Sequence, residues 1–317
     1  MQHLWDLGHG WIRALIGGRA VGLLVLTQLL GALVFVAPAS QAEEIHKEKS
    51  LYRNIIVREG DGRRCLLFSV KRGERSQTCM DLQDPRRLVF AYARMSLGGL
   101  LVNPNPARVL VIGLGGGSIP VALAELYPDA HIDVVEIDEA VVRVAKQFFN
   151  FSETERLQVA VADARVFIKR AVLRKNHYDL IILDAFTGDY IPEHLMTREF
   201  LQETRDLLTD DGVLVANTFS TSVLYDHESV TYFEVFGDFL NFKLPISGNR
   251  VVIAARQGLP GDFVLKNQAL RLAPQLLPYG VDLLDFPANM RRDQDWDASR
   301  RALTDQYSPA NLLRDED

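Results

Sequence analysis

Residues 109–118 read VLVIGLGGGS, in which four consecutive apolar residues lead directly into a turn that contains four glycines. A short apolar run of this kind predicts a strand that is buried on both faces, and the pattern from Ile119 to Tyr127 predicts a helix. A strand that ends in a glycine-rich turn and enters a helix presents backbone N–H groups at its carboxyl end, where open α/β sheets bind nucleotides. We therefore predict that Gly113, Gly115 and Gly117 let a ligand approach the backbone closely.

Strand and helix patterns alternate along the chain after this stretch. Such alternation is typical of βαβ units around a parallel sheet. We predict an α/β fold: a Rossmann-like, mostly parallel sheet with flanking helices over residues 84–258. Strands are expected at 131–136, 157–162, 178–183, 212–217 and 249–255, and helices from Asp84 to about Gly99 and at 139–149, 164–173, 197–208 and 233–242.

Acidic residues stand where the next three predicted strands end. Glu136 closes the second strand, Asp163 with Ala164 follows the third, and Asp184 closes the fourth. Because these ends meet at one edge of a parallel sheet, Glu136 is placed to accept hydrogen bonds from ribose hydroxyls and Asp163 from an adenine amine. Any one of these acids is alternatively a helix cap, but capping does not account for the glycine turn in the same register.

The glycine turn lacks the features of sites that bind phosphate groups. No lysine follows the glycines, which excludes a P-loop, and Ser118-Ile119-Pro120 stands where a dinucleotide site has its third glycine. An adenosine ligand without phosphates therefore fits this turn better than a dinucleotide.

A small β module is predicted over residues 43–83, before the α/β region. Leu51 to Glu59 favours a strand, and residues 64–70 and 76–80 favour a hairpin. A turn near Arg72 would place Cys65 and Cys79 opposite each other, so a disulfide is one interpretation. The other is a pair of small apolar residues in a half-buried hairpin.

The N-terminal segment has the layout of a targeting sequence. Arg13 and Arg19 precede an uncharged stretch from Ala20 to Ala42, which ends in small residues. This order is typical of a signal peptide, with cleavage expected after Ala42, and an uncleaved membrane anchor is the alternative. We expect residues 13–42 to direct the chain to the periplasm or the cytoplasmic membrane. A mis-assigned start would instead leave the protein in the cytoplasm.

Composition excludes several other classes of protein. The formal net charge is −6, which argues against a nucleic-acid-binding surface. The two cysteines exclude a disulfide-dense scaffold and a four-cysteine zinc site, and the histidines show no metal-ligand spacing, so no metal is expected. Residues 259–317 predict a polar helical extension interrupted by prolines, without chemistry of its own.

Taken together, these motifs resemble the class I S-adenosylmethionine-dependent methyltransferase-like fold, and more narrowly the spermidine synthase (polyamine aminopropyltransferase) family. The small β module is similar to the N-terminal domain of that family. The resemblance covers roughly residues 50–256, and its motifs are the run Val109–Gly113 with its glycine turn, Glu136-Ile137-Asp138, Asp163-Ala164, and Tyr178-Asp179 through Asp184.

The resemblance implies a transferase of polyamine biosynthesis. Its co-substrate would be decarboxylated S-adenosylmethionine or S-adenosylmethionine itself, its acceptor a putrescine-like amine, and its assembly a homodimer. Asp184 matches the catalytic base of the family, and Tyr92 lies in a Tyr-His-Glu-like motif that would contact the acceptor. The residues implied to bind the co-substrate are Gly113, Gly115, Gly117, Glu136, Asp163, Ala164 and Gln77.

The chain departs from the family pattern where the family binds cations. Gly116 and Thr187 each stand where the family has an aspartate, and Ala93-Arg94 stands where it has His-Glu. Asp189 is the candidate to replace the aspartate lost at Thr187. Because a desolvated ammonium without counter-charges is costly, these losses predict weak diamine binding. Two alternatives therefore stay open: a methyltransferase on the same scaffold, and a nucleoside-binding relative without catalysis.

Overall fold

The computed structural model describes residues 42–70, 73–187, 190–245 and 247–307. Almost all of the predicted targeting segment 13–42, and the candidate residue Asp189, lie outside these ranges. Residues 40–317 form one compact unit, and the structure below is that of this unit.

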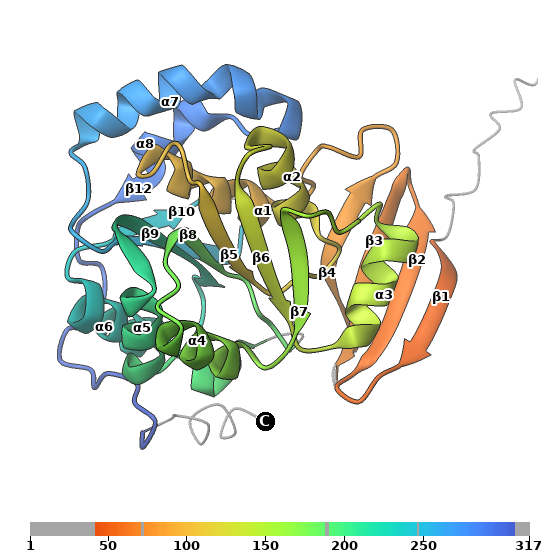
Figure 1. Cartoon of the computed structure of the whole chain (residues 1–317), viewed down its shortest axis with the longest axis horizontal. Helices are drawn as coiled ribbons and strands as arrows, with labels where there is room; N and C mark the ends of the chain where they lie inside the picture. The colour runs from red at the N-terminus through yellow and green to blue at the C-terminus, as the bar shows by residue number, and fades with distance from the viewer. Residues whose placement is uncertain (1–41, 71–72, 188–189, 246, 308–317) are drawn as a thin grey trace, which may run out of the picture. The chain divides into compact units, whose positions relative to one another are not determined.

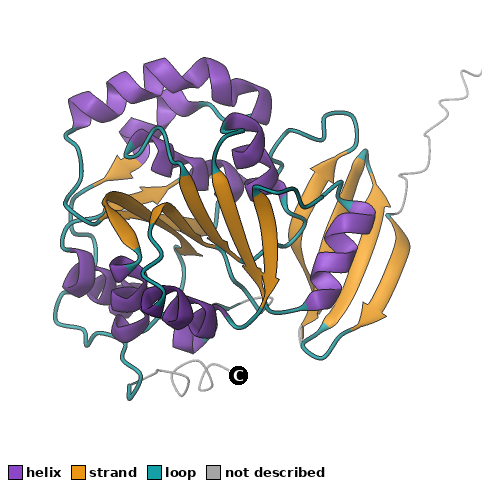
Figure 2. Ribbon diagram, in the orientation of Figure 1, coloured by secondary structure: helices purple, strands orange, loops and turns teal. Residues whose placement is uncertain are grey.

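A mostly parallel sheet forms the centre of the unit (Figures 1 and 2). The strand order is β12-β10-β11-β9-β8-β5-β6-β7. The five strands from β9 to β7 in this order are parallel, and β11, β10 and β12 add an antiparallel edge. The strands are β5 (Arg108–Ile112), β6 (His131–Glu136), β7 (Leu157–Val161), β8 (Tyr178–Leu183), β9 (Leu208–Phe219), β10 (Leu240–Lys243), β11 (Asn249–Ala255) and β12 (Met290–Arg291).

Helices cover both faces of this sheet, as the alternating pattern predicts. One face packs against α1 (Ala91–Ser96), η1 (Leu97–Leu101), α2 (Ser118–Leu126) and α7 (Asp262–Leu276). The other packs against α4 (Ala164–Leu173), α5 (Arg198–Asp206) and α6 (Tyr225–Phe236). Figure 1 shows α7 and the group α4, α5 and α6 on opposite sides of the strands. The remaining short helices are η2 (Glu193–Leu195), η3 (Leu277–Tyr279), η4 (Leu283–Asp285) and α8 (Phe286–Asn289).

A second, antiparallel sheet is formed by the N-terminal module. It has the order β1-β2-β3-β4, with β1 (Glu43–Lys49), β2 (Asn54–Gly60), β3 (Arg63–Val70) and β4 (Gly73–Asp81). Helix α3 (Glu139–Phe148) lies against this sheet in Figure 1. Its Val141 and Val144 pack with Ile55 and Leu66 of the module, whereas its Ala145 belongs to the core of the large sheet. Because α3 is apolar on both sides, it joins the two sheets.

Two predicted helices were wrong, and tertiary contacts explain both. The helix expected from Asp84 begins only at Ala91, because residues 84–87 form a turn and Leu88 donates its N–H to Tyr279 and bridges to Met80. The helix expected at 233–242 is α6, which ends before Gly237, whose φ is 73°. The residues after Gly237 form β10 instead.

The C-terminal segment packs onto the same core as the α/β region. The apolar side of α7, with Leu265, Leu272 and Leu276, is buried there, and β12 pairs with β10. The segment therefore contributes both a helix and a strand to the main body. Across the described part of the chain, no helix has the length and apolar character needed to cross a membrane.

Candidate active site

A cavity of about 680 Å³ opens at the carboxyl ends of β5, β6 and β8, where the N-terminal module meets the large sheet. Strand β5 has β6 on one side and β8 on the other, which is the topological switch point where open α/β sheets bind ligands. The residues predicted from the sequence that line this cavity are Gln77, Tyr92, Gly113, Gly115, Glu136, Asp163, Ala164 and Asp184.

The glycines of the turn have distinct tasks. Gly113 has a φ of 96°, and a Cβ there would overlap with the backbone carbonyl of Asp184. The close approach of the two backbones at the ends of β5 and β8 therefore requires glycine. Gly115 has a φ of 54° and lines the cavity. Gly117, in contrast, does not line it: a Cβ there would lie 2.6 Å from the Phe151 ring. Gly117 therefore permits close packing before α2.

Glu136 is buried at the end of β6 and braces the glycine turn. Its Oε2 accepts a hydrogen bond from the N–H of Leu114 at 3.1 Å, and its Oε1 accepts one from Asp138 at 3.0 Å. Burial raises the pKa of this carboxyl, and the two backbone donors oppose the shift. Each oxygen keeps lone-pair capacity toward the cavity, which matches the predicted contact with two ribose hydroxyls.

Asp163 serves both as a helix cap and as a cavity residue. Its Oδ1 accepts the N–H of Val166 at 2.9 Å and so caps α4. Its Oδ2 lies 3.1 Å from Nε2 of His194, which the sequence analysis placed among scattered histidines without a role. His194 also lines the cavity. The capping bond fixes the carboxylate through Oδ1 and leaves Oδ2 free to contact His194.

Asp184 is a cavity carboxylate whose acidity is altered by its surroundings. Burial raises the pKa of its carboxyl to about 7, and a hydrogen bond from Asn217 opposes this shift. The Nδ2 of Asn217 donates to Oδ1 of Asp184 at 2.8 Å, and Oδ1 of Asn217 accepts from Nδ2 of Asn249 at 3.0 Å. An acid with a pKa near neutrality is suited to accept a proton at physiological pH.

Residues of the N-terminal module and Tyr92 of α1 form another part of the cavity wall. Tyr92 donates its hydroxyl to the backbone carbonyl of Gln77 at 2.8 Å, and burial together with the charge of Asp184 raises its pKa well above its ordinary value. Arg53 stacks on the ring of Phe68 at 4.4 Å and donates to the carbonyl of Phe186 at 3.0 Å. These contacts tie the β module to the loop after β8.

A disulfide joins Cys65 and Cys79 across the hairpin that forms this wall. The two cysteines are partners in the register of β3 and β4, as the predicted hairpin implied. Cys79 stands two residues after Gln77, so the covalent link lies beside the strand segment that faces the cavity.

Two departures from the family pattern have a different meaning in the structure. Arg94 does not line the cavity, because its Nη1 donates to the carbonyls of Leu88 and Val89 at 2.6 and 2.8 Å. The expectation that it adds a cation to the acceptor pocket was wrong. Gly116 does not line the cavity either, and a Cβ there would lie 2.5 Å from Cγ2 of Thr78. Thr187 does line the cavity, so a loss of charge at that position affects the pocket.

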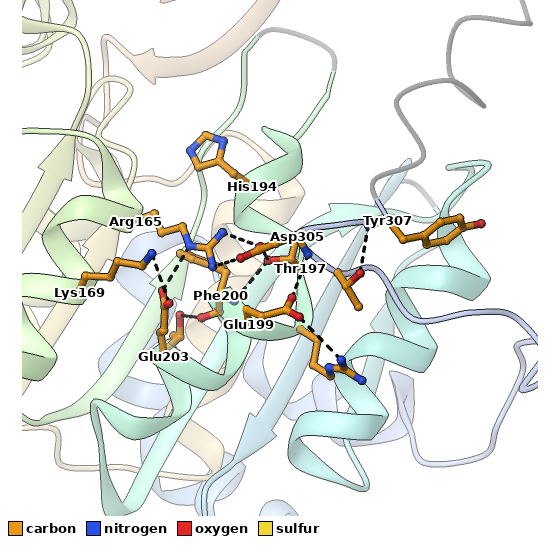
Figure 3. Close-up of polar contacts among 12 residues, drawn as sticks. Arg165, Lys169, His194, Thr197, Glu199, Phe200, Glu203, Asp305 and Tyr307 are labelled. Carbon is orange, nitrogen blue, oxygen red and sulfur yellow. Dashed lines mark hydrogen bonds and ion pairs between the residues drawn. The ribbon is translucent and has the colours of Figure 1, made fainter.

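The C-terminal segment fixes the end of the loop that carries His194 (Figure 3). Arg165 of α4 donates to both oxygens of Asp305, at 2.6 and 2.7 Å. Thr197, the N-cap of α5, donates to Oδ1 of Asp305 at 2.7 Å, and Arg198 donates its N–H to Leu303. These contacts of Leu303 and Asp305 therefore hold the start of α5 directly after the η2 turn.

The side chains that line the cavity differ between its two ends. Glu136 and Asp163 lie at the end expected to hold adenosine, whereas Asp184 and the aromatic residues Tyr92, Phe186 and Phe219 line the other. Within the described ranges, no group of three His, Cys, Asp or Glu residues is arranged to hold a metal ion.

Asn217, Asn249, His194 and Arg53 are cavity residues that the sequence analysis did not select. For Asn217 a signal existed, since it follows a predicted strand as Asp184 does. Arg53 precedes β2 and Asn249 is the first residue of β11. Only the tertiary fold brings these two residues to the cavity.

Comparison with known proteins places this site in a family. A model of the spermine/spermidine synthase domain matches residues 90–247. Over 295 residues, the chain is 54% identical to a polyamine aminopropyltransferase of Vibrio vulnificus (strain CMCP6), which covers 92% of this chain and 98% of that relative. Over 149 residues, it is 37% identical to the eEF1A lysine and N-terminal methyltransferase of Bos taurus, covering 42% of this chain and 21% of that one.

The fold is shared with a solved structure as well. A probable spermidine synthase from Corynebacterium glutamicum ATCC 13032 superposes with a TM-score of 0.61 at 20% sequence identity, and the match covers 81% of this chain and 98% of that one.

Proposed function

Because this chain belongs to the spermine/spermidine synthase family, we propose that it is an aminopropyltransferase of polyamine biosynthesis, with its active site in the cavity around Asp184. The single observation that carries the site assignment is the position of Asp184. A half-buried carboxyl with a pKa of about 7 follows β8 in the same cavity as Glu136 and the glycine turn.

The proposed donor is decarboxylated S-adenosylmethionine. Its adenosine would lie over Gly113 and Gly115, with the ribose hydroxyls on Glu136 and the adenine amine on Asp163. The family resemblance supports this donor, and the two free lone-pair positions on Glu136 support the orientation.

The reaction that follows from this arrangement is a nucleophilic displacement. The amine lone pair of the acceptor attacks the methylene carbon bonded to the sulfonium, the carbon–sulfur bond breaks, and methylthioadenosine leaves. The attacking nitrogen loses a proton, which Asp184 accepts. Because the sulfonium is already an activated leaving group, the protein contributes alignment and a base.

Product analysis tests this function. The protein is incubated with decarboxylated S-adenosylmethionine and putrescine, and spermidine and methylthioadenosine are quantified. We expect equal amounts of both products, and a loss of about a hundredfold or more in kcat for Asp184→Asn, because a general base contributes about 10²–10⁴-fold. The matched control is Asp206→Asn, an exposed acid on α5 outside the cavity. Absence of product with every amine tested would overturn the proposal.

Methyl transfer is the second candidate function, and the 37% identity to a methyltransferase over 149 residues favours it. The leaving group distinguishes the two reactions. Methyl transfer from S-adenosylmethionine releases S-adenosylhomocysteine, whereas aminopropyl transfer releases methylthioadenosine. Mass spectrometry of the reaction with each donor in turn therefore separates them.

We also propose that residues 13–42 direct the chain to the periplasm or hold it at the cytoplasmic membrane. The uncharged stretch after Arg19 supports this, and so does the Cys65–Cys79 disulfide, because disulfides persist in oxidising compartments. Thiol labelling of the unreduced protein from intact cells tests the proposal, and two labelled cysteines would contradict it.

A further inference from the structure

Asp184 is held by a chain of side-chain amides that spans two strands. Asn217, near the end of β9, donates from Nδ2 to Oδ1 of Asp184 at 2.8 Å. Asn249, at the start of β11, donates from its own Nδ2 to Oδ1 of Asn217 at 3.0 Å. Ser247 completes the chain, since its Oγ lies 3.3 Å from Oδ1 of Asn249 and accepts the N–H of Asn249 at 3.1 Å.

Hydrogen-bond chemistry fixes the direction of this chain. An ionised carboxylate only accepts hydrogen bonds, so Asn217 must turn its NH₂ group toward Asp184. Its carbonyl oxygen then faces Asn249, which must donate. The amide of Asn249 therefore sets the orientation of Asn217, although Asn249 is 65 positions from Asp184 in the chain.

The arrangement leaves the two oxygens of Asp184 in different states. Oδ1 is occupied by Asn217, and within the described part of the chain no other side chain donates to this carboxylate. Oδ2 is therefore the oxygen left for an acceptor amine. Asn217 and Asn249 both line the cavity, so the chain lies at the reacting end of the site.

We propose that Asn217 and Asn249 are positioning residues for the transfer reaction: together they orient Asp184 so that Oδ2 receives the proton of the attacking amine. This inference rests on the proposed function in naming the amine. The orientation of Asp184 by the two amides does not depend on it.

An isosteric variant tests the direction of the chain. In Asn249→Asp, residue 249 no longer donates, so Asn217 turns its NH₂ group toward the new carboxylate and presents its carbonyl oxygen to Asp184. The ionised form of Asp184 then loses a donor and faces a dipole of the wrong sign. We expect the rising limb of the kcat/KM pH profile to move up by about one pH unit or more, and kcat at neutral pH to fall about tenfold.

Further variants separate orientation from the added charge and from local packing. Asn249→Leu removes the donor without adding charge, so it is expected to lower kcat with a smaller shift of the pH limb. Ser220→Ala is the matched control, because Ser220 bonds to the carbonyl of Gly248 in the same turn but lies outside the amide chain. We expect Ser220→Ala to keep both the pH profile and kcat of the wild type. Donor KM should remain unchanged in all three.

A readout without turnover keeps the two proposals distinguishable. Carbon-13 NMR of aspartate carboxyls, with the Asp184 signal assigned by its absence in Asp184→Asn, gives the titration midpoint of Asp184 directly. An increase in both Asn249→Asp and Asn249→Leu supports the amide chain even if no amine is a substrate, because Asn249→Leu removes the donor without adding charge. An unchanged midpoint in folded Asn249→Asp would overturn it, whereas a raised midpoint without product from the wild type would overturn only the proposed function.

Discussion

The cost of keeping Asp184 ionised inside the protein can be measured as stability. Burial raises the pKa of this carboxyl from 3.8 to about 7, so the folded protein disfavours the charged form that the unfolded chain adopts freely. A shift of about three pH units corresponds to about 4 kcal/mol, since each unit corresponds to about 1.4 kcal/mol. Because the carboxyl opens into a cavity that water enters, we expect about half of this value, roughly 2 kcal/mol.

The sign of the effect follows from the raised pKa. Below pH 3.8 the carboxyl is protonated in both states and costs nothing. As the pH rises toward 7, the unfolded chain ionises while the folded protein does not, so wild-type stability falls over this window and the deficit is complete above pH 7. The neutral variant Asp184→Asn avoids the deficit. It should therefore be more stable than the wild type at pH 8 and equally stable near pH 4.

Urea denaturation of both proteins at pH 4.5, 6 and 8 measures this difference. Glu228 is a second buried acid whose pKa burial raises to about 7, but it is present in both proteins and cancels from the comparison. Equal stability of the two proteins at pH 8, or a gain by Asp184→Asn that does not depend on pH, would refute the assignment of Asp184 as a buried acid of raised pKa.

Three other perturbations test separate parts of the structure. Glu136→Ala should weaken binding of methylthioadenosine about a hundredfold or more by calorimetry, because two ribose hydroxyls lose a charged acceptor; unchanged affinity would remove Glu136 from the site. Serine at both Cys65 and Cys79 should lower the free energy of unfolding by about 3 kcal/mol, since the disulfide closes a loop with a sequence separation of 14. If reductant lowers the stability of the wild type by no more than it lowers the stability of the double variant, the disulfide contributes nothing to stability. Asp305→Ala should cost about 1 kcal/mol and raise the donor KM severalfold, because it releases Thr197 below His194 (Figure 3). The surface control Asp293→Ala, which frees only Arg291, should change neither quantity.

Local patterns predicted the central architecture well. Apolar runs predicted β6, β8 and β11 with their observed bounds. The glycine turn and the acids after the strands indicated the edge of the sheet where the cavity lies. These features are local because they depend on burial of consecutive residues and on a positive φ, which Gly113 supplies. The predicted hairpin placed Cys65 opposite Cys79 but left the disulfide as one of two interpretations, and the structure shows it formed.

Long-range contacts decided what local patterns missed. The segment before Ala91 has helical residues, but the hydrogen bond from Leu88 to Tyr279 and a turn at 84–87 replace the first helical turns. The residues after Gly237 form β10 because they pair with β11. The side chain of Arg94 does not line the cavity, because its guanidinium donates to two backbone carbonyls.

The chemistry of the reacting end also depends on tertiary structure. Sequence alone selected Asp184, since its position after a strand follows from the alternating pattern. Its raised pKa, its hydrogen bond from Asn217 and the bond from Asn249 to Asn217 arise only when β8, β9 and β11 lie side by side. Acidity depends on burial and on donors from distant strands, so residue type and spacing identify the carboxylate, and the folded sheet sets its pKa.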